Sequence, residues 1–325
     1  MRKLLVHAKS FARIEGALKP YSDQISPLVL DDQGELHQPW GESEASAAIA
    51  YGTSDAYFAP SVMVFFQTLF GLEQLDWFQS SAAGTEHPMI QATGKKANLF
   101  TGSHAQSHAI AEWVLWAGLD FYQAGAARRQ AQRDENWTRL PFREVSNTRW
   151  LLVGFGGIGQ ATGARLKALG AEVIGVRRSG GTSPAADQII TPDQMLATLP
   201  EIDAVVLCLP LTEATENMAD AAFFAAMKPG ALFINVGRGG LVDEDALLRA
   251  LDAGTPAEAY LDVVREEPLP AGDPIWRHSK VTLTPHISAL TEESKRRTDQ
   301  VFLENLKRFH DGAILNNLVA KDVFS

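Results

Sequence analysis

The stretch LLVGFGGIGQATGARLKALG, residues 151–170, decides the fold class of this 325-residue chain. Gly154, Gly156 and Gly159 stand in the G-x-G-x-x-G spacing, directly after an apolar strand pattern and at the start of a helical one. In that context the first glycine permits a tight turn, the second lets a pyrophosphate approach the backbone, and the third allows close packing of helix on strand. The stretch therefore predicts a dinucleotide site at a helix N-terminus, with a tight turn that binds no ligand as the alternative.

Strand and helix patterns alternate on both sides of this stretch. Short β-rich runs separated by helical segments after residue 150 predict a parallel sheet with helices on both faces. The expected strands there are 151–153, 172–176, 204–209, 231–236, 259–263 and 281–284, and the expected helices are 158–169, 192–198, 219–227 and 243–253. Elsewhere we expect strands at 4–8, 47–52 and 75–80, and helices at 60–70 (with Pro60 in its first turn), 104–124 and 291–311.

Composition limits the class of protein. Hydrophobic residues make up 46% of the chain, and 29 Lys and Arg against 39 Asp and Glu give a net charge of −10, so we expect no nucleic-acid or anionic-membrane partner. The single cysteine, Cys208, excludes an internal disulfide and a cysteine-based zinc site and suits a reducing compartment. The N-terminal apolar run stops at His7, which is too short for a signal peptide, so the expected location is the cytoplasm.

The end of the second strand after the glycines predicts the choice of cofactor. A site that prefers NAD places Asp or Glu there to bind the ribose hydroxyls, but this strand ends in Arg177, Arg178 and Ser179. Two guanidinium groups and a hydroxyl suit a 2′-phosphate. We therefore expect NADP(H) to be preferred over NAD(H); a pair of solvated surface arginines is the alternative.

Three polar residues follow later strands, on the side where open α/β sheets bind ligands. Arg238 lies between glycines after the strand at 231–236, Glu267 follows 259–263, and His286 follows 281–284. An arginine that binds a carboxylate, a histidine that donates a proton and a carboxylate that orients the histidine suit the reduction of a 2-oxo acid. From spacing alone, a surface cap and a hydrogen-bonded turn residue are the alternatives for Arg238 and His286.

Three blocks resemble the signatures of the D-isomer-specific 2-hydroxyacid dehydrogenase family. They are MKPGALFINVGRGGLVDEDALLRALDAG (227–254), LDVVREEPLP (261–270) and TPHIS (284–288). The resemblance implies that Arg238 binds substrate, that Glu267 is the partner of the histidine, and that His286 is the acid/base. It also implies that Ala83 and Gly84, in SSAAGTEH (80–87), offer backbone N–H groups to the substrate carboxylate. The positions expected to bind the cofactor are Gly154, Phe155, Gly156, Gly157, Ile158, Gly159, Arg177, Arg178, Ser179, Leu209, Pro210, Thr215, Val236, Asp262, His286 and Ser288.

The architecture that the resemblance implies is α/β, with two doubly wound parallel-sheet domains of the Rossmann and flavodoxin-like kind and an active-site cleft between them. A substrate domain would comprise 1–101 and 287–325, and a dinucleotide domain 102–286. The family implies a homodimer through the cofactor domain and the 104–149 segment. Arg177, Arg178 and Trp276 resemble the glyoxylate/hydroxypyruvate reductase branch, so the expected reaction is NADPH-dependent reduction of a small 2-oxo acid to the D-2-hydroxy acid.

Rival interpretations remain open. A dinucleotide-sensing regulatory protein would share the fold, and another dehydrogenase of the same fold would oxidise a substrate such as phosphite. His104, His108 and Glu112 stand four residues apart, which on one helix would give metal-ligand geometry; hydrogen bonds across a hinge are the alternative that we favour, and we expect no metal.

Overall fold

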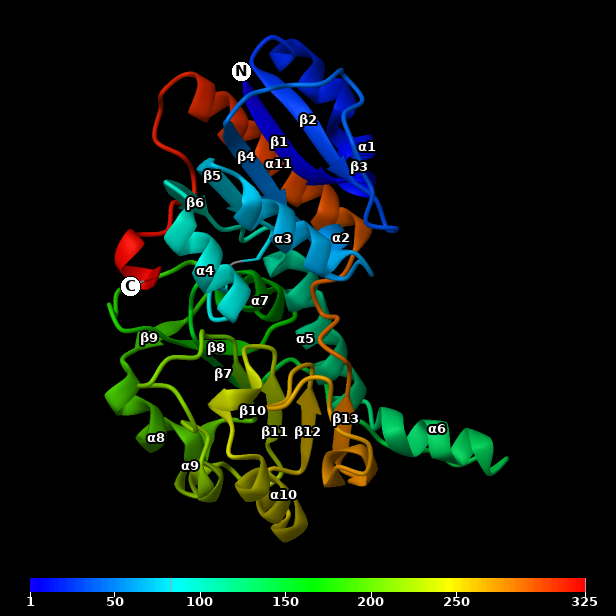
Figure 1. Ribbon diagram of the computed structural model, residues 1–325. Helices are drawn as coiled ribbons and strands as arrows, with labels where there is room; N and C mark the ends of the chain where they lie inside the picture. The colour runs from blue at the N-terminus through cyan, green and yellow to red at the C-terminus, as the bar shows by residue number, and fades with distance from the viewer. Residues whose placement is uncertain (83, 325) are drawn as a thin grey trace. The chain divides into compact units, whose positions relative to one another are not determined.

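The computed structural model describes residues 1–82 and 84–324, which form two compact units, each built around its own sheet (Figure 1). The first unit comprises Met1–Gln106 and Leu290–Ser325, and the second comprises Ser107–Ala289, so the second is inserted into the first along the chain. Within the described residues, every helix is too short or too polar to cross a membrane.

The sheet of the first unit has the strand order β3-β2-β1-β4-β5-β6 and is parallel except for the β2–β3 hairpin. Its strands are β1 (Arg2–His7), β2 (Ile25–Leu30), β3 (Leu36–His37), β4 (Ala47–Gly52), β5 (Gln74–Ser80) and β6 (Leu99–Thr101). Its helices are α1 (Ala8–Leu18), α2 (Ser54–Tyr57), α3 (Val62–Gly71), α4 (Pro88–Lys96) and α11 (Glu292–His310).

The sheet of the second unit is parallel throughout, in the order β13-β12-β11-β10-β7-β8-β9. Its strands are β7 (Arg149–Val153), β8 (Glu172–Val176), β9 (Gln188–Ile190), β10 (Ala204–Leu207), β11 (Leu232–Asn235), β12 (Glu258–Leu261) and β13 (Val281–Leu283). Its helices are α5 (Ser107–Tyr122), α6 (Gly125–Arg133), α7 (Gly157–Ala168), α8 (Met195–Thr198), α9 (Ala221–Ala226) and α10 (Glu244–Ala253). Strand order reverses direction between β7 and β10, which is where doubly wound sheets bind ligands.

Burial on both faces explains why the strands of the second unit are continuous apolar runs. In β7, Leu151 and Val153 belong to one hydrophobic cluster, while Trp150 and Leu152 belong to another on the opposite face. Because successive side chains of a strand point to opposite faces, both faces need apolar residues when helices cover both. The predicted α/β class with two doubly wound sheets is confirmed.

Several local predictions were incomplete. The pattern missed β2, β3, β6 and β9, because β2 contains Pro27 and the other three are only two or three residues long. The expected helix at 60–70 begins later, at Val62, with Pro60 before its N-cap rather than in its first turn. The helix expected at 104–124 is shorter, Ser107–Tyr122.

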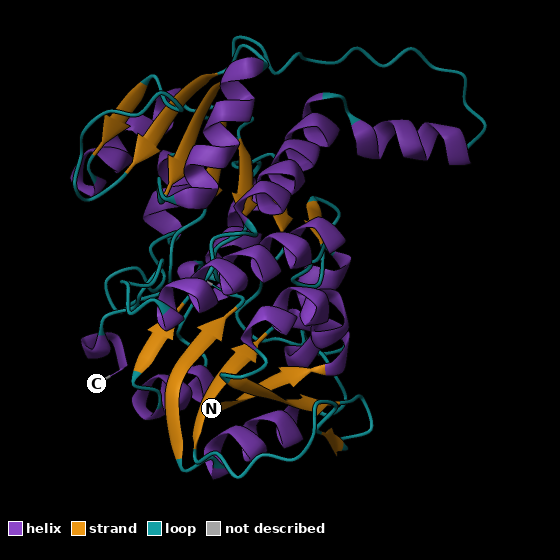
Figure 2. Cartoon of the chain, turned by 90° about the horizontal axis from the view of Figure 1, so that it is seen from above, coloured by secondary structure: helices purple, strands orange, loops and turns teal. Residues whose placement is uncertain are grey.

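The segment after α5 forms an arm, which we define as residues 125–147. It consists of α6, whose Ala, Arg and Gln residues have high helix propensity but no buried side chain, and a long returning loop (Figure 2). Figure 1 shows α6 extending away from the sheet of its own unit. The guanidinium of Arg129 binds both carboxylate oxygens of Asp120 on α5, at 2.5 and 2.9 Å, and so anchors the base of the arm.

Candidate active site

The glycine loop between β7 and α7 requires glycine for reasons visible in the fold. Gly154 has φ of +97°, and a Cβ there would lie 2.6 Å from Cβ of Leu209 and 2.7 Å from the carbonyl oxygen of Cys208. A Cβ on Gly159 would lie 2.6 Å from the carbonyl oxygen of Gly154. These two glycines are therefore needed for the turn and for the packing of α7 on β7.

Gly156 differs from its neighbours, because a Cβ added to it would meet nothing within 4 Å and its φ is −89°. The fold itself thus gives no reason for glycine at this position, whereas a phosphate that approaches the backbone does. Gly156 is also the N-cap of α7 and offers no side-chain cap, so the first N–H groups of a 12-residue helix are left for a ligand. Among the expected cofactor residues, Gly157 and Ile158 lie in this first turn and fit a pyrophosphate.

Phe155, also expected at the cofactor, has a buried side chain that packs under the loop. Its ring would contact a Cβ at Gly159 and at Gly175, and it belongs to the hydrophobic cluster on one face of the sheet. Its N–H group is bound to the carbonyl oxygen of Val176 at 3.0 Å. Phe155 therefore has a core role, which sequence spacing alone could not distinguish from a contact with ligand.

The segment after β8 presents its arginines differently. Arg177 is half-buried, and its Nε donates to the carbonyl oxygen of Gly180 at 2.7 Å, so its guanidinium shapes its own turn. Arg178 and Ser179 are exposed. The nearest following carboxylate, Asp187, accepts from the N–H of Val173 and pairs with Lys167, away from a ribose-binding position. The exposed guanidinium and hydroxyl suit a ribose 2′-phosphate.

Leu209 and the loop after it face the glycine loop across the switch point. Leu209 contacts Gly154, and Oγ1 of Thr215 accepts from the N–H of Thr212 at 2.8 Å and donates to the carbonyl oxygen of Pro210 at 3.0 Å. Beneath the loop, the Cys208 thiol is buried, which raises its pKa to about 12. That thiol is neutral at physiological pH, so it is a packing group.

Arg238 follows β11 and is held by a residue that the sequence analysis did not single out. The side chain of Asn235, at the end of β11, accepts from the N–H of Gly237 at 3.0 Å and donates to the carbonyl oxygen of Arg238 at 2.9 Å. Asn235 is buried, and the neighbouring Val236 is 5% exposed. The Asn235 side chain thereby fixes the backbone of Arg238. In the sequence, the only sign of this role is a polar residue at the end of an apolar strand.

Glu267 and His286, separated by 18 residues in the chain, meet at hydrogen-bonding distance. Oε2 of Glu267 lies 2.7 Å from Nδ1 of His286, and Oε1 accepts from the N–H of Val264 at 3.1 Å. Burial alone would raise the pKa of the Glu267 carboxyl, but the hydrogen bond and charge of His286, with smaller contributions from Val264 and Arg238, hold it below its usual value. The Glu267 carboxylate is therefore ionised at neutral pH and accepts a hydrogen bond. The hydrogen of that bond is carried by Nδ1 of His286.

Asp262, expected to line the cofactor, directs its carboxylate to the loop that carries His286. Its Oδ1 accepts from Oγ1 of Thr284 at 2.5 Å and from the N–H of Ile287 at 2.9 Å, and its Oδ2 accepts from the N–H of Ser288 at 3.0 Å. Asp262 is 1% exposed, and Ser288 is also buried. These bonds hold the loop while His286 adopts φ of +53°, a strained conformation for a residue other than glycine.

The two substrate-loop positions belong to the first unit. Ala83 lies outside the described residues, and Gly84 is in the described segment that follows β5. Arg238, Glu267 and His286 all belong to the second unit, in loops after the neighbouring strands β11, β12 and β13.

The metal-ligand alternative for His104, His108 and Glu112 requires that one helix carry all three, but α5 begins only at Ser107. His108 and Glu112 instead lie near the same guanidinium, that of Arg165, at 3.0 and 3.7 Å. The alternative of three ligands on one helical face is thus wrong: His108 forms a hydrogen bond and Glu112 an ion pair with Arg165, within the second unit.

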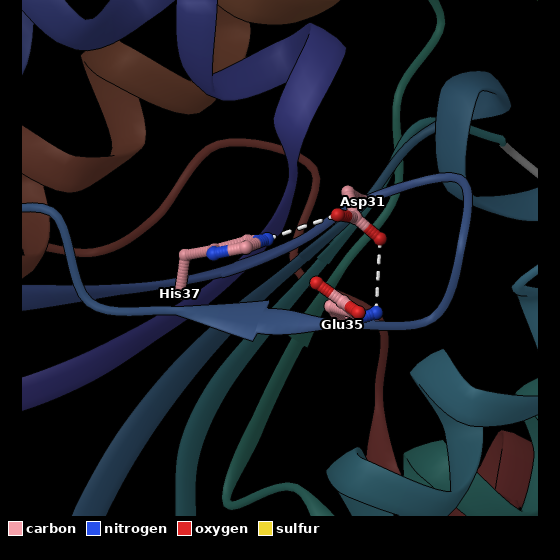
Figure 3. Close-up of side chains that lie close together, drawn as sticks. All are labelled: Asp31, Glu35 and His37. Carbon is pink, nitrogen blue, oxygen red and sulfur yellow. Dashed lines mark hydrogen bonds and ion pairs between the residues drawn. The ribbon is translucent and has the colours of Figure 1, made fainter.

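A different group of metal-ligating side chains lies in the β2–β3 hairpin, where Figure 3 shows Asp31, Glu35 and His37 together. Their ligand atoms lie within 4.8 Å of one another. Oδ1 of Asp31 accepts from the N–H groups of Gln33 and Glu35, both at 2.9 Å, and its Oδ2 lies 2.9 Å from Nε2 of His37. These contacts stabilise the hairpin turn, and we assign the group a structural role.

Comparisons with known proteins identify relatives of this chain. Residues 115–288 match the family model described as D-isomer specific 2-hydroxyacid dehydrogenase, NAD binding domain. The chain is 40% identical over 212 residues to (S)-sulfolactate dehydrogenase of Chromohalobacter salexigens, which covers 64% of this chain and 68% of that protein. It is 38% identical over 176 residues to glyoxylate reductase of Thermococcus litoralis, covering 54% of this chain and about half, 52%, of that enzyme.

A solved structure extends the similarity over the whole chain. The D-isomer specific 2-hydroxyacid dehydrogenase from Xanthobacter autotrophicus Py2, in complex with NADPH and MES, has a TM-score of 0.77 and 25% identity. The alignment covers 100% of this chain and 99% of that chain.

Proposed function

The chain belongs to the D-isomer specific 2-hydroxyacid dehydrogenase family, whose members are NAD(P)-dependent enzymes, and from this premise we propose the reaction that it catalyses. The protein reduces a small 2-oxo acid, of the glyoxylate or hydroxypyruvate type, to the D-2-hydroxy acid, with NADPH preferred as the hydride donor. The observation that carries the proposal is the 2.7 Å contact between Oε2 of Glu267 and Nδ1 of His286 at the ligand-binding edge of the sheet. A carbonyl reduction needs such a partnered, half-exposed imidazole, whereas a dinucleotide sensor does not.

Three side chains have separate roles in this reaction. When bound at the glycine loop, a nicotinamide cofactor would supply a hydride to C2 of the substrate. His286, through Nε2, donates a proton to the carbonyl oxygen, so that a 2-oxo acid, NADPH and a proton yield a 2-hydroxy acid and NADP⁺. Glu267 orients the ring through Nδ1 and stabilises its positive charge. Arg238 binds the substrate carboxylate and polarises the carbonyl.

The preference for NADPH rests on the segment after β8. Arg178 and Ser179 are exposed at the end of the strand, and no carboxylate stands in the ribose-binding position. The NADPH complex of the Xanthobacter relative supports this choice. Arg178 would bind the 2′-phosphate, while Arg177 holds the turn from which Arg178 projects.

Initial rates test the proposal when NADPH and NADH are crossed with a panel of 2-oxo acids. The panel comprises glyoxylate, hydroxypyruvate, pyruvate, 3-sulfopyruvate, a branched 2-oxo acid and a phenyl-bearing one. We expect the highest kcat/KM with NADPH and the smallest acids. Tight NADPH binding with no turnover of any of these acids would favour a dinucleotide sensor. Reduction of NADP⁺ by phosphite alone would favour a phosphite-oxidising dehydrogenase. Faster turnover with NADH at equal low concentration would contradict the cofactor preference.

The enzyme is further proposed to act as a homodimer through the second unit. Trp116 and Leu119 on α5 are exposed, and they line a groove of about 440 Å³ beside the base of the arm. On the arm, Trp137 is 99% exposed and Phe142 is 56% exposed. Exposed aromatic residues of this size are typical of a protein interface, and a second copy of the chain is the partner that the family implies.

A further inference from the structure

The loops that carry Arg238 and Glu267 cross each other in direct backbone contact. Gly239, the residue after Arg238, is packed so closely that a Cβ there would lie 1.9 Å from the carbonyl carbon of Val264 and 2.2 Å from the nitrogen of Arg265. The peptide group between residues 264 and 265 is therefore the point where the two loops touch. The peptide that precedes it in the chain contacts Glu267, because the N–H of Val264 donates to Oε1 of Glu267 at 3.1 Å.

A second carboxylate binds the peptide between residues 264 and 265 itself. Oε1 of Glu244, the first residue of α10, accepts from the N–H of Arg265 at 2.7 Å. Two consecutive N–H groups thus bind two glutamates, Glu267 on the catalytic side and Glu244 on the helix side. Burial raises the pKa of the Glu244 carboxyl above its ordinary value despite this hydrogen bond. The charged groups that act on Glu244 are Arg265, Asp273 and Asp245.

We propose that Glu244 is a positioning residue for the Glu267–His286 pair. By fixing the N–H of Arg265, it sets the direction of the preceding N–H, which in turn holds Glu267 with its second oxygen on Nδ1 of His286. Glu244 acts on the reaction only through this chain of contacts, and its role in turnover rests on the proposed function.

A simpler role for Glu244 would be that of an acidic residue in the first turn of a helix, favoured by the helix dipole. Capping is already provided by Asp243, whose Oδ1 accepts from the N–H of Ala246 at 2.9 Å. Asp245 is also acidic and lies in the same turn, but it is exposed. Asp245 is therefore a matched control for charge and helix position.

The test compares Glu244→Ala, Glu244→Gln and Asp245→Ala by the pH dependence of kcat/KM for 2-oxo acid reduction. We expect Glu244→Ala to change the pH profile of kcat/KM, because Glu267 is then held less firmly against the imidazole. Its kcat should fall about tenfold, with the Kd for NADPH changed less than about twofold. Glu244→Gln keeps an oxygen acceptor and should recover most of the loss, and Asp245→Ala should match the wild type.

A spectroscopic readout separates this inference from the proposed function. In the ¹⁵N-labelled protein, the proton on Nδ1 of His286 should give a downfield resonance that Glu267→Gln identifies. Glu244→Ala should shift or broaden that resonance, and Glu244→Gln should preserve it. An unchanged resonance and pH profile in Glu244→Ala would overturn the positioning role, as would an equal effect of Asp245→Ala. If the wild type turns over no 2-oxo acid, the proposed function fails while the resonance still decides the role of Glu244.

Discussion

His286 adopts a left-handed backbone conformation, φ of +53°, at the place where its side chain meets Glu267. Such strain persists only where surrounding contacts fix it. The three hydrogen bonds that Asp262 accepts from residues 284–288 provide that support. The buried carboxylate of Asp262 thus fixes the loop, and the ionised carboxylate of Glu267 orients the imidazole ring.

Replacing the imidazole tests its role at the residue scale. His286→Asn should lower kcat about 10²- to 10⁴-fold, because the carbonyl oxygen loses its proton donor. The Kd for NADPH, measured by quenching of protein fluorescence, should change less than about twofold. A variant that kept wild-type turnover would remove His286 from the chemistry.

The glycines of the first loop make a matched pair. Gly156→Ala should fold with unchanged stability, since its Cβ meets nothing within 4 Å, yet raise the Kd for NADPH about tenfold or more, which is ~1.4 kcal/mol. Gly154→Ala should instead destabilise the protein by about 2 kcal/mol or more, because it combines positive φ with a clash.

Thermal unfolding and NADPH titration of both variants distinguish the two roles. If Gly156→Ala bound NADPH as tightly as the wild type, the pyrophosphate would not approach the backbone at this point. If Gly156→Ala unfolded at as low a temperature as Gly154→Ala, the space beside Gly156 would not be free for a Cβ.

At the scale of elements, the ends of the central strands of the second unit are tied together by Asp203. Its carboxylate, 5% exposed, lies 2.7 Å from Nζ of Lys228, 3.1 Å from Arg143 and 2.9 Å from the N–H of Arg149. Burial by itself would raise the pKa of Asp203, but these three partners hold it below its ordinary value.

The contribution of the Asp203 carboxylate to the free energy of unfolding therefore depends on pH. Because the folded pKa lies below the unfolded value, the contribution is present above the ordinary Asp range and is lost as pH falls through the folded pKa. Asp203→Asn should cost about 2–4 kcal/mol at pH 7 and much less at pH 3, measured by urea unfolding. Glu201→Gln is the control, since its exposed ion pair with Arg149 contributes less than about 1 kcal/mol. A cost for Asp203→Asn that did not vary with pH would contradict this account.

The sequence predicted the elements that carry strong patterns and missed those that do not. The strand before the glycines appears in the structure as β7, and the helix expected at 243–253 appears as α10. Short strands such as β6 and β9 have too few residues for a period to be recognised. Motif spacing suggested Glu267 and His286, which the fold brings together, but contacts such as those of Asn235 and Glu244 depend on loop geometry that no local pattern contains.

For the whole molecule, the net charge of −10 describes the surface but not the site. The proposed ligands are anions, a phosphorylated dinucleotide and a carboxylate, and the arginines at 177, 178 and 238 lie at the ligand-binding edge of the second sheet. Local placement of positive charge therefore matters more for binding than the overall balance.

The arm provides a prediction about assembly. If it contacts a second copy, the wild-type protein should have twice the 35.4 kDa chain mass by light scattering. The double variant Trp137→Glu, Phe142→Glu should be monomeric, because it places charges in the apolar contact. Ile314→Glu, at an 82% exposed residue of the first unit, is the control and should remain dimeric. A monomeric wild type would exclude the proposed dimer.

In the proposed reaction, a hydride reaches C2 of a 2-oxo acid from the nicotinamide while the protein supplies the proton. The most direct measurement is isotope transfer from NADPH carrying deuterium at the reactive C4 position, with hydroxypyruvate as substrate and the product analysed by mass spectrometry and chiral chromatography. We expect one deuterium at C2 of D-glycerate for each NADPH oxidised. Oxidation of NADPH with no deuterium in the product, or formation of the L-acid, would contradict the proposed reaction.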